Sequence, residues 1–190
     1  MNKKTFGAST FVFPQPIFLV GVNIEGKPNF MTVAWGGMAC GAPPMLTAAI
    51  RHQRYTMKGI KSGGSFSVNI PDEELVKEAD LCGIVSGANA DKVSACNFDI
   101  FYGKLESAPL IRQCPVNLEC KVVHILDLGS HALVVGSIEE THVSESCLTD
   151  GNPDIAKIKP LLYSRGVTPL YYAFGSSVGE AFHIGNELRK

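Results

Sequence analysis

Short apolar runs separated by turn-forming residues dominate the first seventy positions of the chain. These runs cover residues 18–24, 29–35, 45–50 and 66–70, and each has the length of an ordinary strand. Gly26 lies in the turn between the first two runs, where it can adopt a positive φ. Gly36 and Gly37 are expected to break the second strand at its end. The pattern predicts a hairpin followed by further short strands.

Short helices are predicted between and after these strands. They run from Thr56 to Gly63-Gly64, from Asp72 to Cys82-Gly83, over 93–96 after a small-residue loop at 86–92, and onward from Asn152-Pro153. Thr56, Asp72 and Asn152 can each act as an N-cap, because their side-chain oxygens can accept from the first free backbone N–H groups. The glycines favour helix ends, since they adopt the left-handed conformation readily.

Alternation of apolar and polar residues returns in the second half of the chain. It marks strands at 116–126 and 132–138, which residues 142–143 can extend, and an aromatic tail follows at 170–184. The count is six to eight short strands joined by tight turns, with two or three short helices and no regular βαβ alternation. This favours a mainly β fold, an antiparallel barrel with helical insertions, over a doubly wound sheet. Because no linker divides the chain, residues 1–190 are expected to form one domain.

Composition narrows the class of protein further. The chain has 45% apolar residues, 18% charged residues and a formal net charge of −1. A chain of this kind is expected to fold, and it has no general electrostatic attraction for nucleic acid or anionic lipid. The apolar run at 11–24 is interrupted by Pro14, Pro16 and Asn23, so it is too short to span a bilayer. We expect a soluble cytoplasmic protein that binds neither nucleic acid nor membrane.

The cysteines and histidines do not suggest a metal site. The six cysteines are Cys40, Cys82, Cys96, Cys114, Cys120 and Cys147, and no pair has the two-residue gap of a zinc knuckle or a dithiol redox site. Buried, reduced thiols are therefore expected. The histidines outside the tail do not have metal-ligand spacing either, and no bound metal is predicted.

The segment 51–56 carries the most specific chemistry in the chain. It places Arg51, Arg54, Tyr55 and Thr56 in a turn between a strand and a short helix. Arginine offers a planar fork of donors that matches phosphate oxygens, and the start of a helix favours an anion. The segment suggests a phosphate-bearing ligand, although a solvated surface turn has the same composition.

Five segments in this order resemble the flavin reductase-like family, and within it the flavoredoxin branch. They are 29–35 (NFMTVAW), 42–44 (APP), 51–56 (RHQRYT), 64–69 (GSFSVN) and 86–92 (SGANADK), and the resemblance extends over roughly residues 10–185. It implies an FMN-binding split β-barrel, a Greek-key-like antiparallel barrel, that works as a homodimer with FMN near the subunit interface.

The resemblance also implies a set of cofactor-binding residues. Thr32, Val33, Ala34 and Trp35 would run past the isoalloxazine ring, and Arg51, Arg54, Tyr55, Thr56, Ser86, Gly87, Asp91 and Lys92 would surround the phosphate. Asn69 would support the ligand. Trp35 or Phe182 could supply the apolar cover that the ring faces need, and His183 could lie over the flavin from the partner subunit. No catalytic side chain is required, because flavin N5 carries the hydride itself.

Several of these residues have simpler interpretations. Trp35 suits the core or the dimer interface, and Asn69 can cap a strand end. Asp91 can hold the loop backbone rather than touch the ligand, since a carboxylate beside a phosphate is repulsive unless it is paired. His183 can be an ordinary surface histidine.

The leading functional hypothesis is a flavoredoxin-type oxidoreductase or electron-transfer protein that cycles bound FMN between oxidised and reduced forms. Its electrons would come from NAD(P)H or a protein donor and pass to an acceptor that the sequence does not identify. The alternatives are an NAD(P)H-dependent reductase of free flavin that supplies a partner enzyme, a non-catalytic FMN-binding or storage protein, and a structural split barrel with an emptied pocket.

Overall fold

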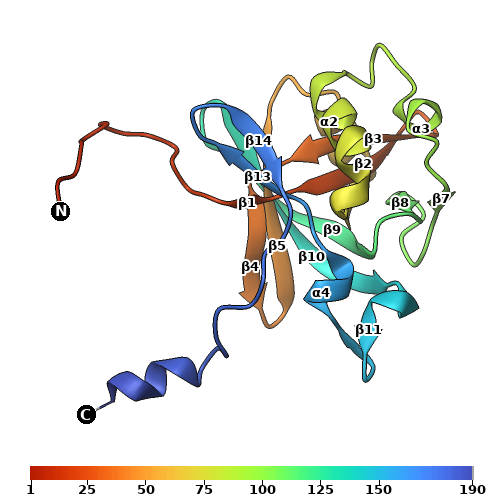
Figure 1. The fold of residues 1–190 in the computed structure, drawn as a ribbon. Coiled ribbons are helices and arrows are strands. Elements are labelled where there is room, and N and C mark those ends of the chain that lie inside the picture. The colour runs from red at the N-terminus through yellow and green to blue at the C-terminus, as the bar shows by residue number, and fades with distance from the viewer. Residues whose placement is uncertain (190) are drawn as a thin grey trace.

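One antiparallel sheet forms the body of the protein. The computed structural model describes residues 1–189, and its largest sheet has seven strands in the order β3-β2-β6-β9-β10-β5-β4. These strands are β2 (Phe18–Ile24), β3 (Lys27–Val33), β4 (Gly36–Gly41), β5 (Pro44–Arg51), β6 (Ser65–Ile70), β9 (Val116–Asp127) and β10 (His131–Val143). The sheet curls so that β3 approaches β5 although the two are not hydrogen-bonded neighbours (Figure 1). The mainly β fold expected from the sequence is confirmed.

Strand β2 buries both of its faces. Val20 and Val22 of β2 lie in one core cluster, which also contains Phe66 and Val68 of β6. Leu19 belongs to a second cluster, which also holds members from outside the large sheet. Successive side chains of a strand point to opposite faces, so one strand can serve two cores. This explains why residues 18–24 form a continuous apolar run rather than an alternating one.

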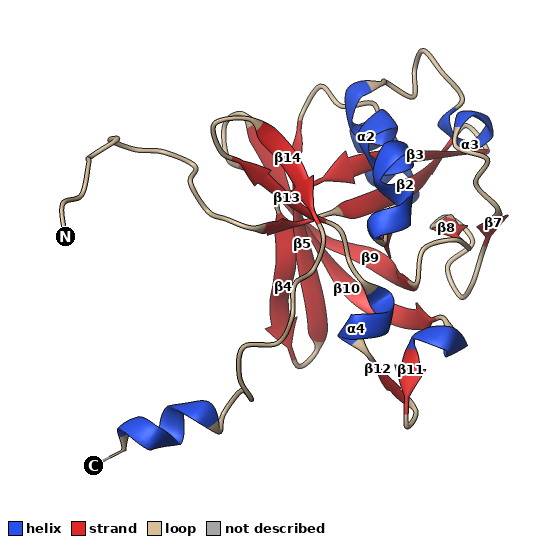
Figure 2. Ribbon diagram, viewed as in Figure 1, coloured by secondary structure: helices blue, strands red, loops and turns tan. Residues whose placement is uncertain are grey.

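Short helices cover the sheet near β2 and β3. They are α1 (Thr56–Gly63), the 3₁₀ turn η1 (Glu73–Leu75) with α2 (Val76–Ile84), and α3 (Lys92–Ala95) (Figure 2). The predicted end of α1 is confirmed, because Gly64 is left-handed with φ 63° and donates its N–H to Ile60. Asp72 caps η1 as expected, accepting from the backbone N–H groups of Glu74 and Leu75.

A second, three-stranded sheet lies beside the large one. It has the order β1-β13-β14 and consists of β1 (Gln15–Pro16), β13 (Leu162–Arg165) and β14 (Pro169–Tyr172). The remaining elements are β7 (Ile100–Phe101), β8 (Leu110–Ile111), η2 (Glu145–Cys147), β11 (Leu148–Thr149), β12 (Asn152–Pro153), α4 (Ile155–Ile158) and η3 (Ile184–Leu188). The N-terminal arm and the C-terminal tail both extend away from the body (Figure 1).

Three local predictions are wrong. The preceding strand β3 already ends at Val33, and Gly36 and Gly37 lie in strand β4 rather than in a break. A Cβ at position 36 would lie 2.7 Å from both Phe18 and the Thr47 carbonyl oxygen, so only glycine permits this close strand packing. Thr56 does not cap α1, since the N-cap is Tyr55 and it makes no side-chain capping bond. Asn152 pairs in β12, and Asp154 caps α4 by accepting from the Ala156 N–H over 2.9 Å.

The structure also bears on the cysteines, on possible metal ligands and on possible membrane-spanning helices, all of which were considered in the sequence. All six cysteines are free thiols, and four of them are buried. Within residues 1–189 no group of three or more His, Cys, Asp or Glu side chains could hold a metal ion. In the same part of the chain, no helix is both long and apolar enough to cross a lipid bilayer.

Candidate cofactor-binding site

Two adjoining cavities lie between β3, β5 and the helices, with volumes of about 440 Å³ and about 300 Å³. Met31, Arg51 and Arg54 line both of them, so the two cavities meet at the arginines. Arg51 ends β5, and Arg54 follows three residues later in the turn before α1. The sequence cluster at 51–56 therefore lies at the junction of a two-part cavity.

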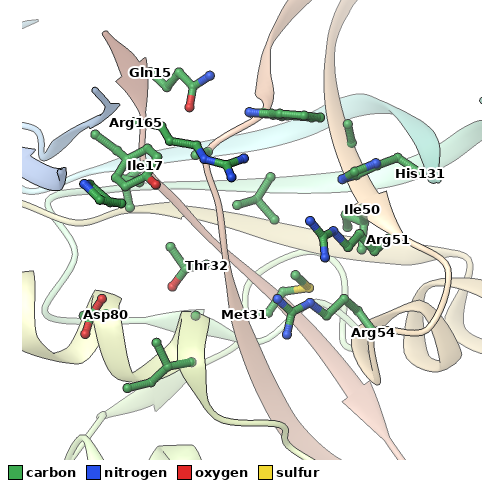
Figure 3. Close-up of a pocket in the computed structure, with 18 of the residues that line it drawn as sticks. Gln15, Ile17, Met31, Thr32, Ile50, Arg51, Arg54, Asp80, His131 and Arg165 are labelled. Atoms are coloured by element: carbon green, nitrogen blue, oxygen red, sulfur yellow. The ribbon is translucent and has the colours of Figure 1, made fainter. Parts of the chain in front are cut away.

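The larger cavity has an extended backbone along one side. Thr32 and Val33 end β3, and Ala34 and Trp35 continue from them, all four lining the cavity. Thr32 donates its hydroxyl hydrogen to the Ala79 carbonyl oxygen of α2, which ties the end of β3 to that helix. Figure 3 shows the Arg51 and Arg54 guanidinium groups turned into this cavity. The strand end and the two arginines were both expected at the site, and the fold brings them together.

Trp35 forms the outer part of this wall. Its indole stacks on the His131 ring, with 4.9 Å between ring centroids and 29° between the planes, and its side chain is 39% exposed. Burial, together with the nearby Arg51 and His52 charges, lowers the pKa of His131 below its usual value. Trp35 thus lies outside the core and is packed against His131, and its ring forms an aromatic surface at the cavity edge.

The smaller cavity is built around the start of α1. Arg51, Arg54, Tyr55 and Thr56 line it from one side, and the loop with Ser86 and Gly87 lines it from the other. Helix α1 has no side-chain cap and no acidic residue in its first turn. The positive end of its backbone dipole is therefore left uncompensated beside two arginines. This arrangement favours an anion.

Asn29 orients the Thr56 hydroxyl within this smaller cavity. Asn29 Nδ2 donates to Thr56 Oγ1 over 2.9 Å, and both side chains are buried. Because Thr56 Oγ1 accepts this bond, its own hydrogen is free to donate elsewhere. Gly87 packs directly on the same asparagine: a Cβ at position 87 would collide with Asn29 Oδ1 and lie 2.8 Å from its Cγ. The sequence motif contained Asn29, but its link to Thr56 was not predicted.

Lys92 lines the smaller cavity, and its ammonium group has backbone partners. Nζ donates to the Phe30 carbonyl oxygen over 2.8 Å and to the Cys82 carbonyl oxygen over 3.0 Å. The side chain is 4% exposed, and this burial lowers the pKa of the lysine. An ammonium group has three donors, so one remains for a ligand. Lys92 joins β3, α2 and α3 around the cavity, whatever else it contacts.

Asp91 and Ser86 make local loop contacts. Asp91 accepts from the Ser94 backbone N–H over 3.1 Å and from the Ser94 hydroxyl over 2.8 Å, and both bonds lower its pKa. It lines a neighbouring cavity of about 720 Å³, outside the two described above. Ser86 Oγ accepts from the Ala88 N–H over 3.3 Å. Asp91 thus holds the loop and caps α3, in line with the simpler interpretation.

Besides Asp91, three residues from the expected set lie away from these cavities. Asn69 is fully buried; it donates to the Leu19 carbonyl oxygen over 2.9 Å and accepts from the Ile111 N–H over 2.9 Å. Phe182 is 99% exposed, and His183 Nδ1 lies 3.2 Å from Oε1 of the exposed Glu180. Both lie in the tail that extends from the body (Figure 1). Their contact with a ligand stays a prediction.

One wall of the larger cavity is formed by residues that were not predicted from the sequence. It comes from the β1-β13-β14 sheet and presents Gln15, Tyr163, Arg165, Pro169 and Tyr171. The hairpin of β13 and β14 was not predicted, because its short strands fall in a segment rich in Gly, Pro and aromatic residues. The alternation of Tyr163 and Arg165 was the available signal.

Comparison with known proteins places the chain among flavin proteins. The sequence model described as "Flavin reductase like domain" matches residues 9–171. The crystal structure of a flavoredoxin from Methanosarcina acetivorans is 38% identical, covers 99% of this chain and 100% of its own, and superimposes with a TM-score of 0.94. A flavoredoxin of Desulfovibrio vulgaris (Miyazaki F) is 36% identical, with coverage of 97% and 100% and a TM-score of 0.90. An uncharacterized protein of Archaeoglobus fulgidus is 35% identical over 156 residues, which is 82% of this chain and 86% of that protein.

Proposed function

This chain belongs to the flavin reductase-like family and to its flavoredoxin branch, and from that premise we propose that it binds FMN and transfers electrons through it. The observation that carries the proposal is the two-part cavity with Arg51 and Arg54 at its junction. One part offers charge and free N–H groups, and the other offers an extended backbone with an aromatic edge. These are the requirements of a phosphate and of a flavin ring.

The smaller cavity would hold the FMN phosphate. Arg51 and Arg54 supply two guanidinium groups, and the uncapped start of α1 adds its positive end. Thr56 has a hydroxyl hydrogen to donate, because Asn29 occupies its oxygen. Gly87 brings the facing loop close enough to close the cavity, since no side chain intervenes.

The larger cavity would hold the isoalloxazine ring. The backbone from Thr32 to Trp35 can offer donors and acceptors along a polar ring edge, and Met31 and Ile50 offer apolar contacts. FMN, when bound, supplies the hydride and electron chemistry. The residues of the chain bind and orient it, and they need not act as acid, base or nucleophile.

We further propose that two copies of the chain assemble into a homodimer. Large apolar side chains are exposed on the arm, the sheet and the tail: Phe6, Phe11, Phe13, Met38, Leu126, Leu128, Phe174 and Phe182. Arm and tail both extend away from their own body, so a second copy offers them a surface (Figure 1). An apolar cavity of about 360 Å³ beside Trp35 and Pro16 is available to receive such a side chain. In this arrangement the partner's tail would complete the cover of the ring.

The electron donor is NADH, NADPH or a reduced protein in this proposal, and the flavin stays bound during turnover. A reductase of free flavin is the competing function, and it has the same fold. The rate of flavin exchange separates the two: a flavoredoxin-type protein retains FMN through gel filtration, whereas a free-flavin reductase loses it.

The direct test is the absorption spectrum of the purified protein, followed by FMN titration and by anaerobic addition of NADH and then NADPH. We expect a yellow protein with one FMN per chain, bleached by a physiological donor. Protein that is colourless and binds no FMN at micromolar concentration would contradict the proposal. Bound FMN that no donor reduces would identify a storage protein instead.

A further inference from the structure

The face of the small β1-β13-β14 sheet that borders the larger cavity is set by strand register. Gln15 pairs with Tyr163, Tyr163 pairs with Tyr171, and Arg165 pairs with Pro169. Directly paired residues share a face, and so do residues two apart on one strand. All five side chains therefore belong to one face, and all five line the cavity.

Arg165 enters the cavity from this face. Figure 3 shows its guanidinium group turned inward, toward the same space that Arg51 and Arg54 enter from the opposite wall. Within residues 1–189 none of these three arginines forms an ion pair with a carboxylate. Asp80 is the one acidic residue among the described residues that line this cavity, and its Oδ1 accepts from the Tyr171 hydroxyl over 3.0 Å.

Among the described residues that line the cavity, three arginines and a single carboxylate, Asp80, leave an excess of positive charge. The arginines repel one another unless an anion enters. The FMN phosphate at the smaller cavity accounts for Arg51 and Arg54, which line both cavities. It leaves Arg165 unaccounted for, because Arg165 lines only the larger cavity, on its opposite wall. Arg165 is also exposed, so a molecule that diffuses to the FMN-loaded protein can reach it.

We propose that Arg165 forms a second anion subsite, which binds a phosphate or carboxylate group of the small molecule that exchanges electrons with the flavin. This assignment rests on the proposed function, and it gives the exchanging molecule a chemical class: an organic anion. Arginine suits the role, because its planar fork binds either group through two parallel hydrogen bonds.

The surroundings of Arg165 fix the strand that carries it and complete the subsite. The bond from Tyr171 to Asp80 ties the β13-β14 hairpin to α2, which fixes the wall that carries the arginine. The Tyr163 and Tyr171 rings lie 5.7 Å apart on the same wall, and they offer an apolar flank to the organic part of the ligand. The subsite is therefore built for an anion attached to an apolar or aromatic group.

The test uses FMN-loaded protein, with pyrophosphate and oxalate as probes of the two anion types. Wild type, Arg165→Ala and Arg165→Lys are compared with Arg112→Ala, which removes an arginine whose partner is Asp99 outside these cavities. Isothermal titration gives the anion affinity, and FMN retention is measured on the same samples by absorbance after gel filtration.

We expect all four proteins to retain FMN. At least one of the two anions should bind wild type and Arg112→Ala equally, Arg165→Ala about tenfold or more weakly, and Arg165→Lys with intermediate affinity. A preference for pyrophosphate would identify a phosphate ligand, and a preference for oxalate a carboxylate ligand; either supports the subsite.

Three results would overturn the proposal of an anion subsite at Arg165. Wild type that binds neither anion has no such subsite, and Arg165→Ala that binds as wild type does shows that another group holds the anion. Arg165→Ala that loses FMN shows that the arginine serves the cofactor, which leaves the proposed function intact. Failure of the proposed function itself is distinguished by wild type that does not retain FMN.

Discussion

Asn29 donates its amide hydrogen to the hydroxyl oxygen of Thr56, and the bond joins β3 to the first residue of α1 across 27 positions of sequence. The distance is 2.9 Å, and both residues are buried. Because Thr56 Oγ1 accepts a hydrogen from Asn29, the threonine hydroxyl must direct its own hydrogen to a different partner. An asparagine outside the basic cluster thus orients the hydroxyl group of Thr56 within it.

Asn29→Ala is expected to weaken FMN binding by about five- to thirtyfold, which corresponds to the loss of about 1–2 kcal/mol of hydrogen-bond free energy. Asn29→Asp should weaken it more, because a carboxylate would accept the threonine hydrogen and place negative charge beside the phosphate. FMN titration followed by fluorescence measures both. Asn23→Ala is a matched control, since Asn23 also loses side-chain hydrogen bonds but lies outside these two cavities. Equal affinities for Asn29→Ala and wild type would contradict the role of the bond.

Gly87→Ala is expected to reduce FMN affinity through the same asparagine. The new methyl group would lie 2.8 Å from Asn29 Cγ, so the amide must move away from Thr56 or the loop must retreat. Gly41→Ala is the control, because a Cβ at position 41 meets nothing within 4 Å. If Gly87→Ala keeps its fold, as judged by circular dichroism, and binds FMN with wild-type affinity, then the close approach of the loop does not contribute to FMN binding.

Arg51→Ala combined with Arg54→Ala is expected to abolish retention of FMN through gel filtration. Each charge-assisted hydrogen bond to a phosphate contributes about 1.5–3 kcal/mol, so the pair should weaken binding by at least about a hundredfold. Both side chains are exposed, and the thermal unfolding midpoint without FMN should stay near that of wild type. Arg112→Ala again serves as control. Unchanged FMN retention in the double variant would place the phosphate elsewhere.

Removal of the tail after Gly175 tests the proposed dimer. The truncated chain loses Phe182, which is 99% exposed in a single copy, together with His183. We expect a larger monomer fraction by analytical ultracentrifugation and weaker FMN binding, because the partner's tail would no longer cover the ring. A full-length chain that sediments as a monomer at micromolar concentration would exclude the dimer.

Glu119 is expected to contribute to acid sensitivity. Its side chain is fully buried, and burial alone would raise its pKa. Hydrogen bonds from His142 Nε2 at 2.8 Å and from the backbone N–H groups of Leu105 and Lys104 outweigh that effect, so the pKa is lowered. A lowered folded-state pKa gives stability that is present above the unfolded pKa and is lost as pH falls through the folded one.

Urea unfolding at several pH values between 7 and about 3 measures this contribution. Glu119→Gln should lower the free energy of unfolding at pH 7 by about 3 kcal/mol, because the neutral amide no longer offers His142 and the two backbone N–H groups a charged acceptor. It should also reduce the loss of stability on acidification, because position 119 no longer titrates. Glu25→Gln, which breaks the exposed pair of Glu25 with Lys58, should change little. Parallel pH profiles for wild type and Glu119→Gln would show that another group governs acid unfolding.

The parts of the fold that the sequence predicted correctly are those with local causes. Strand β2 occupies the predicted residues 18–24. Helix α1 ends at the predicted glycine, because a left-handed residue satisfies the last carbonyl groups. Asp72 caps η1 for the same kind of local reason. In each case the residues that decide the structure are within a few positions of one another.

The wrong or missing predictions depend on contacts between distant segments. Gly36 was expected to break a strand, but it lies in β4, where the absence of a Cβ allows close packing against Phe18 and Thr47. The bonds from Lys92 to the Phe30 and Cys82 carbonyl oxygens were not predicted, and its expected contact with a phosphate stays a prediction. The position of Arg165 opposite Arg51 follows from the pairing of β1 with β13, which lie almost 150 residues apart.

The sequence by itself determined the strand-rich class of the protein, its family and the basic cluster at 51–56, because apolar periodicity and motif order are properties of short segments. The tertiary structure decided which groups surround that cluster. Closure of the sheet brings Asn29 to Thr56, sets Arg51 and Arg54 between two cavities, and places Arg165 on the facing wall. Hydrogen bonds and charges act over a few ångströms, so only the folded chain determines which side chains come within reach of one another.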